Sequence, residues 1–360
     1  MITQDVRRAI ARALAAEGFA PADPGLRPGG RPGCYASSVA FGLAGGRAPR
    51  DIARLLAARL AAVPWLASAE VSGPGFLALT VTAETLAALP GRIAAAGPAC
   101  ARSDVLSGVT VEAPPAVALL AADGRGESPP AVALPAVGRE AEAPPAAGPL
   151  PAVGWEEARA ALAAELTARL AAAAGATVAS SSYPERSGPS PPGHWHFSGD
   201  VAAAVGFAGI DAVRFSLAAA VPGRPVRIDG AQIARHLPGN PAYAVRYAHA
   251  RAASGVRWAA TLAAEAGPRC LPADPGELAL LDALSWLPER VAVAARRGRP
   301  DEYARYLEEL ASVTIATLSS PRDPGSAGAP GTDRLAVAGA ARTGLAAGLG
   351  LIGVSAPDRL

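Results

Sequence analysis

Lysine is absent from the sequence, so all 33 basic residues of the chain are arginines. Alanine is abundant as well, and this combination is typical of a GC-rich coding bias, so a single arginine carries little functional information. The net charge is only +2 at pH 7. The sequence therefore does not predict a strongly basic protein, and a nucleic-acid-binding face would have to come from arginines clustered locally.

Cysteines and long apolar runs are also scarce. The three cysteines, Cys34, Cys100 and Cys270, have no paired spacing, so the sequence implies neither a disulfide framework nor a zinc ribbon. The N-terminus has no apolar stretch typical of a secretory signal, and the last apolar run, residues 345–354, is too short and too rich in glycine to span a bilayer. We expect a cytoplasmic protein without a membrane partner.

The chain does contain enough apolar material for folded domains, since 51% of its 360 residues are hydrophobic. This length predicts two or three domains. Apolar periodicity in the first part predicts helices at residues 3–18, 35–43, 49–63 and 83–96. Between the last two, apolar residues alternate around a Ser-Gly-Pro-Gly turn and predict two strands. Residues 1–107 are therefore expected to form an α+β domain.

The middle of the chain, residues 108–199, is predicted to be a small α/β segment with flexible linkers. A strand is expected near residues 108–115 and a helix at 155–174, followed by another strand. The stretches 116–153 and 187–193 are rich in proline, alanine, glycine or serine and predict linkers.

The last part, residues 200–360, is expected to be an all-α helical bundle. Leucines and tyrosines recur at helical spacing and predict long helices at residues 277–295, 301–318 and 333–348.

The most specific pattern of the chain is NPAYAVRYAHAR at residues 240–251, preceded by GIDAVRFSL at 209–217. A proline after Asn240 opens a predicted helix in which Val245, Ala248 and Ala252 share a core-facing side.

Tyr243, Tyr247 and Arg251 are each four residues apart in this predicted helix, so they form a stripe along it. Aromatic rings can stack on unpaired bases and an arginine can hold a phosphate, which makes the stripe a candidate site for single-stranded RNA. The alternative for each tyrosine is that its ring is packed in the core.

Together, GIDAVRFSL and NPAYAVRYAHAR resemble the start of the DALR-type anticodon-binding domain of class I arginyl-tRNA synthetases. The ending GLGLIGVSAPDRL resembles that of the same family, whose final apolar residue lies near the anticodon and corresponds to Leu360. The predicted tRNA contacts in this region are Asn240, Tyr243, Tyr247, His249, Arg251 and Leu360. Arg296 and Arg297 join them as exposed cations, for which a solvated helix end is the alternative.

The first part of the chain resembles the N-terminal domain of the same synthetases, through Tyr-Ala-x-x-x-Ala, Ala-Pro-Arg-x-Ile-Ala and Gly-Pro-Gly-Phe motifs. The resemblance implies contact with the tRNA D-loop, in which Phe76 is retained from the hairpin motif. Two residues later the family usually has Asn or Gln, whereas this chain has Ala78, which cannot hydrogen-bond a base edge. A core position in the sheet is the alternative for Phe76.

The motifs that the family uses to activate arginine are missing from the sequence. In the family, the HIGH histidines and the KMSKS lysine stabilise charge on the ATP phosphates. None of the four histidines (His194, His196, His236 and His249) is followed two positions on by Gly-His, and lysine is absent. The sequence also has no P-loop. We therefore predict no catalytic residues and no cofactor, and we interpret residues 108–199 as a degenerate remnant of the catalytic domain.

A metal site is not predicted either. His194 and His196 could be two ligands on a strand, but no Cys, Asp or Glu cluster accompanies them, so a surface pair in a loop is the better interpretation.

Three functions are compatible with this sequence pattern. The first is a tRNA-binding pseudo-synthetase that binds the anticodon region, with tRNA-Arg as the expected partner and an enzyme using aminoacyl-tRNA as a possible client. The second is an active or partner-assisted, ATP-dependent arginine–tRNA ligase. The third is a protein-interaction module that has lost RNA binding, which the low net charge and Ala78 favour.

Overall fold

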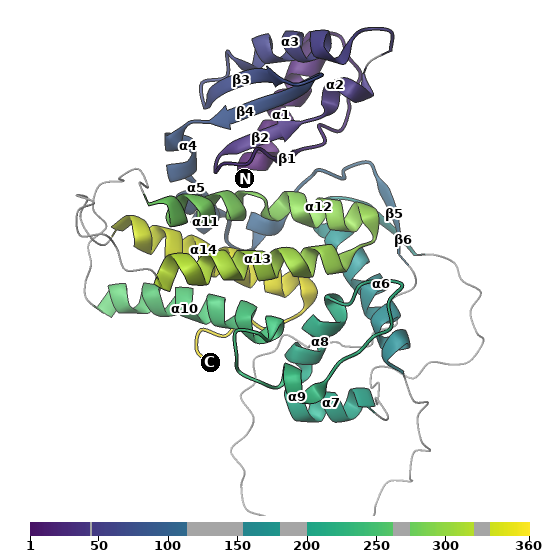
Figure 1. Cartoon of the computed structure of the whole chain (residues 1–360), viewed down its shortest axis with the longest axis vertical. Coiled ribbons are helices and arrows are strands. Elements are labelled where there is room, and N and C mark those ends of the chain that lie inside the picture. The colour runs from purple at the N-terminus through teal and green to yellow at the C-terminus, as the bar shows by residue number, and fades with distance from the viewer. Residues whose placement is uncertain (44, 114–153, 181–199, 262–273, 320–331) are drawn as a thin grey trace, which may run out of the picture.

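The computed structural model of the chain describes residues 1–43, 45–113, 154–180, 200–261, 274–319 and 332–360. Figure 1 shows an N-terminal domain at one end, a bundle of long helices in the centre, and a smaller group of elements beside the bundle. The predicted linkers at 116–153 and 187–193 lie outside the described residues, as do His194 and His196.

The N-terminal domain is a four-stranded antiparallel sheet covered by helices, as the α+β prediction requires. The strands follow the order β1-β2-β4-β3, with β1 (Arg27–Pro28), β2 (Cys34–Ser37), β3 (Leu66–Ser72) and β4 (Phe76–Val81). Along β4, Leu77, Leu79 and Val81 are buried while Phe76 and the residues between them are more exposed. This alternation turns one face of the sheet toward the core that it shares with α1 (Ile2–Ala16) and α3 (Pro49–Leu60).

Two of the predicted helices in this domain are corrected by the structure. The helix expected at residues 35–43 is wrong in its first part, where residues 35–37 belong to β2, and only the short α2 (Val39–Gly42) is helical. Tyr35 pairs with Leu79 across the sheet and is buried, so the neighbouring strand β4 decides its conformation. The helix expected at 83–96 is divided into α4 (Ala83–Ala87) and α5 (Leu89–Ala96), because Pro90 falls in the first turn of a new helix. A 3-10 turn, η1 (Gly97–Ala101), follows.

The middle segment forms a small α/β unit. Strands β5 (Thr110–Ala113) and β6 (Thr177–Ser180) pair in parallel, and α6 (Trp155–Ala173) lies between them in the sequence. Beside it lie α7 (Asp200–Ala208), α8 (Ile210–Ala218) and α9 (Gly230–Ile233). Both strands and the helix agree with the prediction.

The C-terminal bundle consists of the long helices α10 (Pro241–Thr261), α11 (Pro275–Ser285), α12 (Leu287–Arg297), α13 (Pro300–Ser319) and α14 (Thr332–Ile352). The all-α prediction is confirmed for this region. One boundary is wrong, because the single helix expected at 277–295 is broken at Trp286. Pro288 occupies the first turn of α12, where the missing N–H costs nothing, whereas it would have disrupted a continuous helix.

Within the described part of the chain, α14 is the one helix long and apolar enough to cross a membrane, with a mean hydropathy of 1.5 over Arg334–Ile352. More than half of this window, 56%, is buried inside the protein, where α14 packs against α10, α13 and η1. A central helix of a bundle has these properties for the same reason, because its apolar residues contact other helices.

Polar contacts around the α11–α12 junction connect the N-terminal domain to the bundle. Arg7 on α1 donates two hydrogen bonds of 2.6 Å to the carboxylate of Glu289 on α12. The hydroxyl of Thr3 donates to the carbonyl of Ser285 at 2.9 Å, and the hydroxyls of Tyr35 and Ser285 share a hydrogen bond of 2.9 Å. The domain and the bundle therefore have a specific interface.

We expect Glu289→Gln to lower the free energy of unfolding by about 2 kcal/mol. The substitution removes the negative charge from the buried, bidentate, charge-assisted contact between Glu289 and Arg7. Glu289 is 3% exposed, whereas Arg7 keeps Asp23 as a second partner. Urea unfolding measures the change. The control is Glu302→Gln, whose pair with the exposed Arg297 should contribute at most about 1 kcal/mol. Equal effects of the two substitutions would show that the interface does not depend on this contact.

Candidate functional site

The aromatic stripe predicted on α10 is present, and a ring from the preceding loop extends it. The rings of Tyr243 and Tyr247 lie 5.7 Å apart with an interplanar angle of 18°, and His236 lies 5.2 Å from Tyr243 at 10°. These separations and small angles are those of offset stacking. The tyrosines are half-buried and His236 is exposed, so the aromatic stack of His236, Tyr243 and Tyr247 lies at the surface. Sequence analysis missed His236 as a member, since no helical spacing connects it to the tyrosines.

The opposite face of α10 holds the stack in place. Val245, Ala248 and Ala252 are fully buried, as predicted, and α10 packs with them toward α13 and α14. Burial of this face fixes the rotation of the helix about its axis and therefore the direction of the stripe.

Asn240 holds the loop that carries His236 through hydrogen bonds of its side-chain amide. Its side chain is 7% exposed, and its amide donates hydrogen bonds to the carbonyls of Ile233 at 2.6 Å and Arg235 at 2.8 Å. The amide nitrogen thus positions the turn before α10 by satisfying its backbone carbonyls. Oδ1 of Asn240 has no hydrogen-bond partner within the described residues, and the direct tRNA contact of this residue stays a prediction.

The stripe continues along α10 beyond the stack. Arg251 is exposed, and one of its nitrogens donates to the carbonyl of Leu318 at 3.4 Å. Trp258, about two helical turns further on, is on the same side of the helix and is 66% exposed. Sequence analysis did not include this tryptophan, although its spacing from Arg251 was a usable signal.

The C-terminal tail, residues 353–360, runs along α10 and is held at several points. The carbonyl of Asp358 accepts a hydrogen bond of 2.7 Å from Arg257, and its carboxylate pairs with Arg342 at 2.9 Å. Arg246 donates to the hydroxyl of Ser355 at 3.2 Å. Leu360 is 54% exposed at the end of this tail, so the structure places it on the surface near α10.

His249 belongs to the anchoring of this tail rather than to the exposed surface. Its ring is 2% exposed, and Nδ1 lies 3.0 Å from the carbonyl oxygen of Pro357. The direct tRNA contact at His249 therefore stays a prediction, which the burial of this residue and its contact with the tail do not favour. Burial lowers the pKa of His249 and, with the nearby Arg342, outweighs the Pro357 carbonyl and Asp358, which raise it.

Because the folded pKa of His249 lies below its unfolded value of about 6.5, we expect acid to loosen the tail. The contribution of neutral, buried His249 to the free energy of unfolding is complete above the unfolded pKa and is lost as the pH falls through the folded pKa. The urea midpoint should therefore fall between about pH 7.5 and about pH 5, and His249→Gln should remove part of this decrease. His236→Gln is the control, since that ring is exposed. An unchanged pH profile in His249→Gln would contradict this account.

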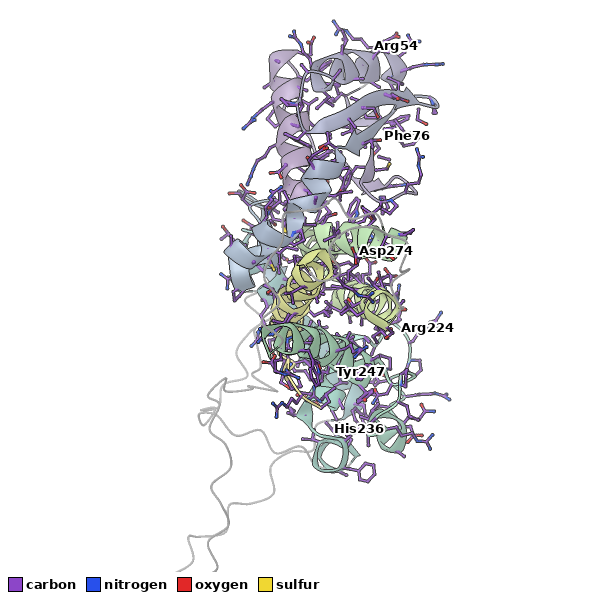
Figure 2. All side chains as sticks on the ribbon, turned by 90° about the vertical axis from the view of Figure 1, so that its left-hand side faces the viewer. Arg54, Phe76, Arg224, His236, Tyr247 and Asp274 are labelled. Atoms are coloured by element: carbon purple, nitrogen blue, oxygen red, sulfur yellow. The ribbon has the colours of Figure 1, made fainter. Side chains whose placement is uncertain are left out.

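The remaining predicted residues lie elsewhere. Arg296 pairs with Asp23 of the N-terminal domain and Arg297 pairs with Glu302 at 3.0 Å, so both arginines are engaged near the domain interface. Phe76 is 37% exposed, and its ring contacts that of Phe41 in a tilted arrangement, with 4.7 Å between the centroids and 51° between the planes. Figure 2 shows Phe76 in the N-terminal domain, far from His236 and Tyr247 at the other end of the molecule. The structure thus brings together the residues of α10 and the tail, but not Arg296, Arg297 or Phe76.

Comparison with known proteins relates both ends of the chain to one family. Residues 1–81 match the arginyl tRNA synthetase N-terminal domain, and residues 245–360 match the DALR anticodon-binding domain. The arginine–tRNA ligase of Frankia alni is 38% identical over 160 residues, and that of Kineococcus radiotolerans is 40% identical over 163 residues. Each alignment covers 42% of this chain and 29% of the ligase, so the chain spans under a third of these relatives.

A solved structure, the arginyl-tRNA synthetase of Thermus thermophilus, is similar over the whole length of both chains with a TM-score of 0.56. Its sequence identity is 19%, so this likeness concerns the fold alone. The positions of the two sequence matches agree with the two larger domains of the structure. The chain is therefore related to the arginyl-tRNA synthetases, with an N-terminal domain of that family at one end and a DALR anticodon-binding domain at the other.

Proposed function

We propose that the protein binds the anticodon region of a tRNA, with tRNA-Arg as its expected partner, and does not aminoacylate it. The observation that carries this proposal is the aromatic stack of His236, Tyr243 and Tyr247, which continues to the exposed Arg251. Stacked rings at a surface bind the faces of unpaired bases, and an adjacent arginine binds a phosphate. An anticodon loop offers both groups.

The tail supports the same proposal. It is held along α10 by Arg257 and Arg342, so the exposed Leu360 is kept near the helix that carries the stack. An exposed apolar side chain held in place near α10 could contact an unstacked base at little entropic cost.

Loss of aminoacylation is supported by the sequence and by the size of the middle segment. The HIGH and KMSKS motifs are absent from the sequence, so their charges cannot stabilise the ATP phosphates during adenylate formation. Between η1 and α7, the described residues form one parallel strand pair and one long helix. A cytoplasmic role in presenting or sequestering tRNA for a client enzyme is consistent with this small middle segment.

Arginine-dependent exchange between ATP and pyrophosphate, measured with the full chain, separates this proposal from a ligase. We expect no exchange above background with or without tRNA-Arg, together with binding of an anticodon-stem hairpin. Exchange above background would establish an active ligase and overturn the proposal. Absence of both activities would favour the protein-interaction alternative, which Ala78 in place of a base-reading side chain also favours.

A further inference from the structure

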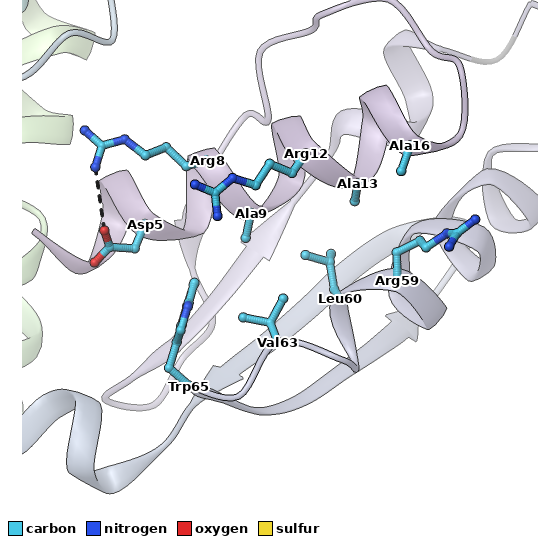
Figure 3. A pocket seen from close by; sticks show the side chains of 10 residues that line it. All are labelled: Asp5, Arg8, Ala9, Arg12, Ala13, Ala16, Arg59, Leu60, Val63 and Trp65. Atoms are coloured by element: carbon cyan, nitrogen blue, oxygen red, sulfur yellow. Dashed lines mark ion pairs between the residues drawn. The ribbon is translucent and has the colours of Figure 1, made fainter.

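The N-terminal domain has a groove of about 340 Å³ between α1 and the end of α3, on the helical side of the domain (Figure 3). Its floor is apolar, formed by Ala9, Ala13, Leu60 and Val63, and its charged or aromatic members are Asp5, Arg8, Arg12, Arg59 and Trp65. Phe76 alternates with the buried Leu77 along β4, so it lies on the opposite face of the sheet. The groove is thus separate from the hairpin.

Positive charge at the groove is incompletely neutralised. Arg8 and Arg12 are four residues apart on α1, so two like charges lie on adjacent turns, an unfavourable arrangement. The carboxylates nearest Arg8 belong to Asp5 at 3.8 Å and Asp104 at 3.7 Å, both long for direct ion pairs. Asp5 is also engaged by Arg92 at 2.5 Å. Arg12 is exposed and makes no hydrogen bond or ion pair within the described residues. An anion at this position would therefore relieve repulsion.

An aromatic surface lies at the same end of the groove. Figure 3 shows the Trp65 ring below α1 near Asp5 and Ala9, while Arg12 extends along α1 toward Arg8. Trp65 is half-buried, and its indole nitrogen has no partner within the described part of the chain. Arg59 lies at the other end, where Glu17 holds it at 2.5 Å.

We propose that this groove binds a nucleotide, with the base against Trp65 and the phosphate between Arg8 and Arg12. Tryptophan offers a face for stacking, and two guanidinium groups bind phosphate oxygens through charge-assisted hydrogen bonds. A volume of about 340 Å³ is within the usual range of small-ligand sites. The nucleotide is either free or part of an RNA strand, since both present the same base and phosphate. The site does not depend on anticodon binding by α10.

Calorimetric titration of the full chain with AMP tests the proposal. We expect saturable binding that Arg12→Gln and Trp65→Leu each weaken about tenfold, because each removes one of the two recognition elements. Arg54→Gln is the matched control, since it removes the same charge from an exposed arginine of α3 that pairs with Asp51, and AMP affinity should not change. Arg12 is exposed, so an unchanged urea midpoint in Arg12→Gln separates loss of binding from loss of fold.

No binding of AMP, or equal affinity in all variants, would overturn the proposal. Inorganic phosphate binding as tightly as AMP would overturn the role of Trp65. Displacement of AMP by short single-stranded oligo(A) would support the site and identify an RNA nucleotide as its ligand. Lack of displacement would support a site for free nucleotides. Because AMP reports on the groove directly, these results are independent of whether α10 binds tRNA.

Discussion

Replacing Arg214 with alanine should lower the free energy of unfolding by about 3 kcal/mol, because removing one partner of a buried ion pair leaves the other charge without compensation. Arg214 on α8 is fully buried. Its guanidinium donates to the Glu165 carboxylate on α6 at 2.5 Å and to the Ile352 carbonyl at the end of α14 at 2.5 Å. One side chain therefore joins the middle segment, α8 and the bundle, and its loss affects all three.

The matched control is Arg169→Ala, which removes another arginine from the same carboxylate. Arg169 lies 3.1 Å from Glu165 and is 42% exposed, so solvent screening should keep its contribution below about 1 kcal/mol. Urea unfolding of both variants gives the comparison. Equal losses in the free energy of unfolding would mean that the buried Arg214 contributes no more than an ordinary surface ion pair. They would contradict the view that Arg214 joins the middle segment to the bundle.

Replacing Tyr247 with alanine should weaken tRNA binding by roughly 5- to 150-fold, the range that corresponds to about 1–3 kcal/mol for one stacked base. The substitution removes the ring that lies 5.7 Å from Tyr243 and next to Arg251 in the stripe. Since Tyr247 is only half-buried, the helical content and the fold should be retained. Binding is measured by titration with tRNA-Arg, and circular dichroism reports on the fold.

Tyr247→Phe is the informative control. The Tyr247 hydroxyl makes no hydrogen bond within the described residues, so phenylalanine keeps the stacking face and loses nothing else inside the protein. Its tRNA affinity should stay within a few-fold of the wild type. Unchanged affinity in Tyr247→Ala would remove the aromatic stack from the proposed function, and a large loss in Tyr247→Phe would replace stacking with a hydroxyl contact.

Local patterns were sufficient to predict most of the long helices and the strands β3, β4, β5 and β6. The core face of α10 follows directly from the spacing of Val245, Ala248 and Ala252, which are all fully buried. The prediction was wrong where a tertiary neighbour decided the conformation. Tyr35 lies in a strand because β4 pairs with it, and a helical pattern across Trp286 did not account for Pro288.

The site was predictable to the extent that it lies on one helix. The Tyr243–Tyr247 pair depends only on a four-residue spacing, and the structure shows the two rings stacked. His236 joins them through a loop that Asn240 holds, which no periodicity predicts. The burial of His249 was not predicted, because its neighbour in space is the Pro357 carbonyl, more than 100 residues away in the chain. Burial of this kind depends on the fold rather than on local sequence.

The most direct test of the central proposal is a binding titration of the full chain against tRNA-Arg and a non-cognate tRNA at two salt concentrations. Phosphate contacts alone weaken steeply with salt, whereas stacking on the rings of α10 should persist. We predict preferential binding of tRNA-Arg that survives the higher salt concentration. Absence of binding, or salt-sensitive binding without preference between the two tRNAs, would contradict the proposal that this DALR domain reads an anticodon.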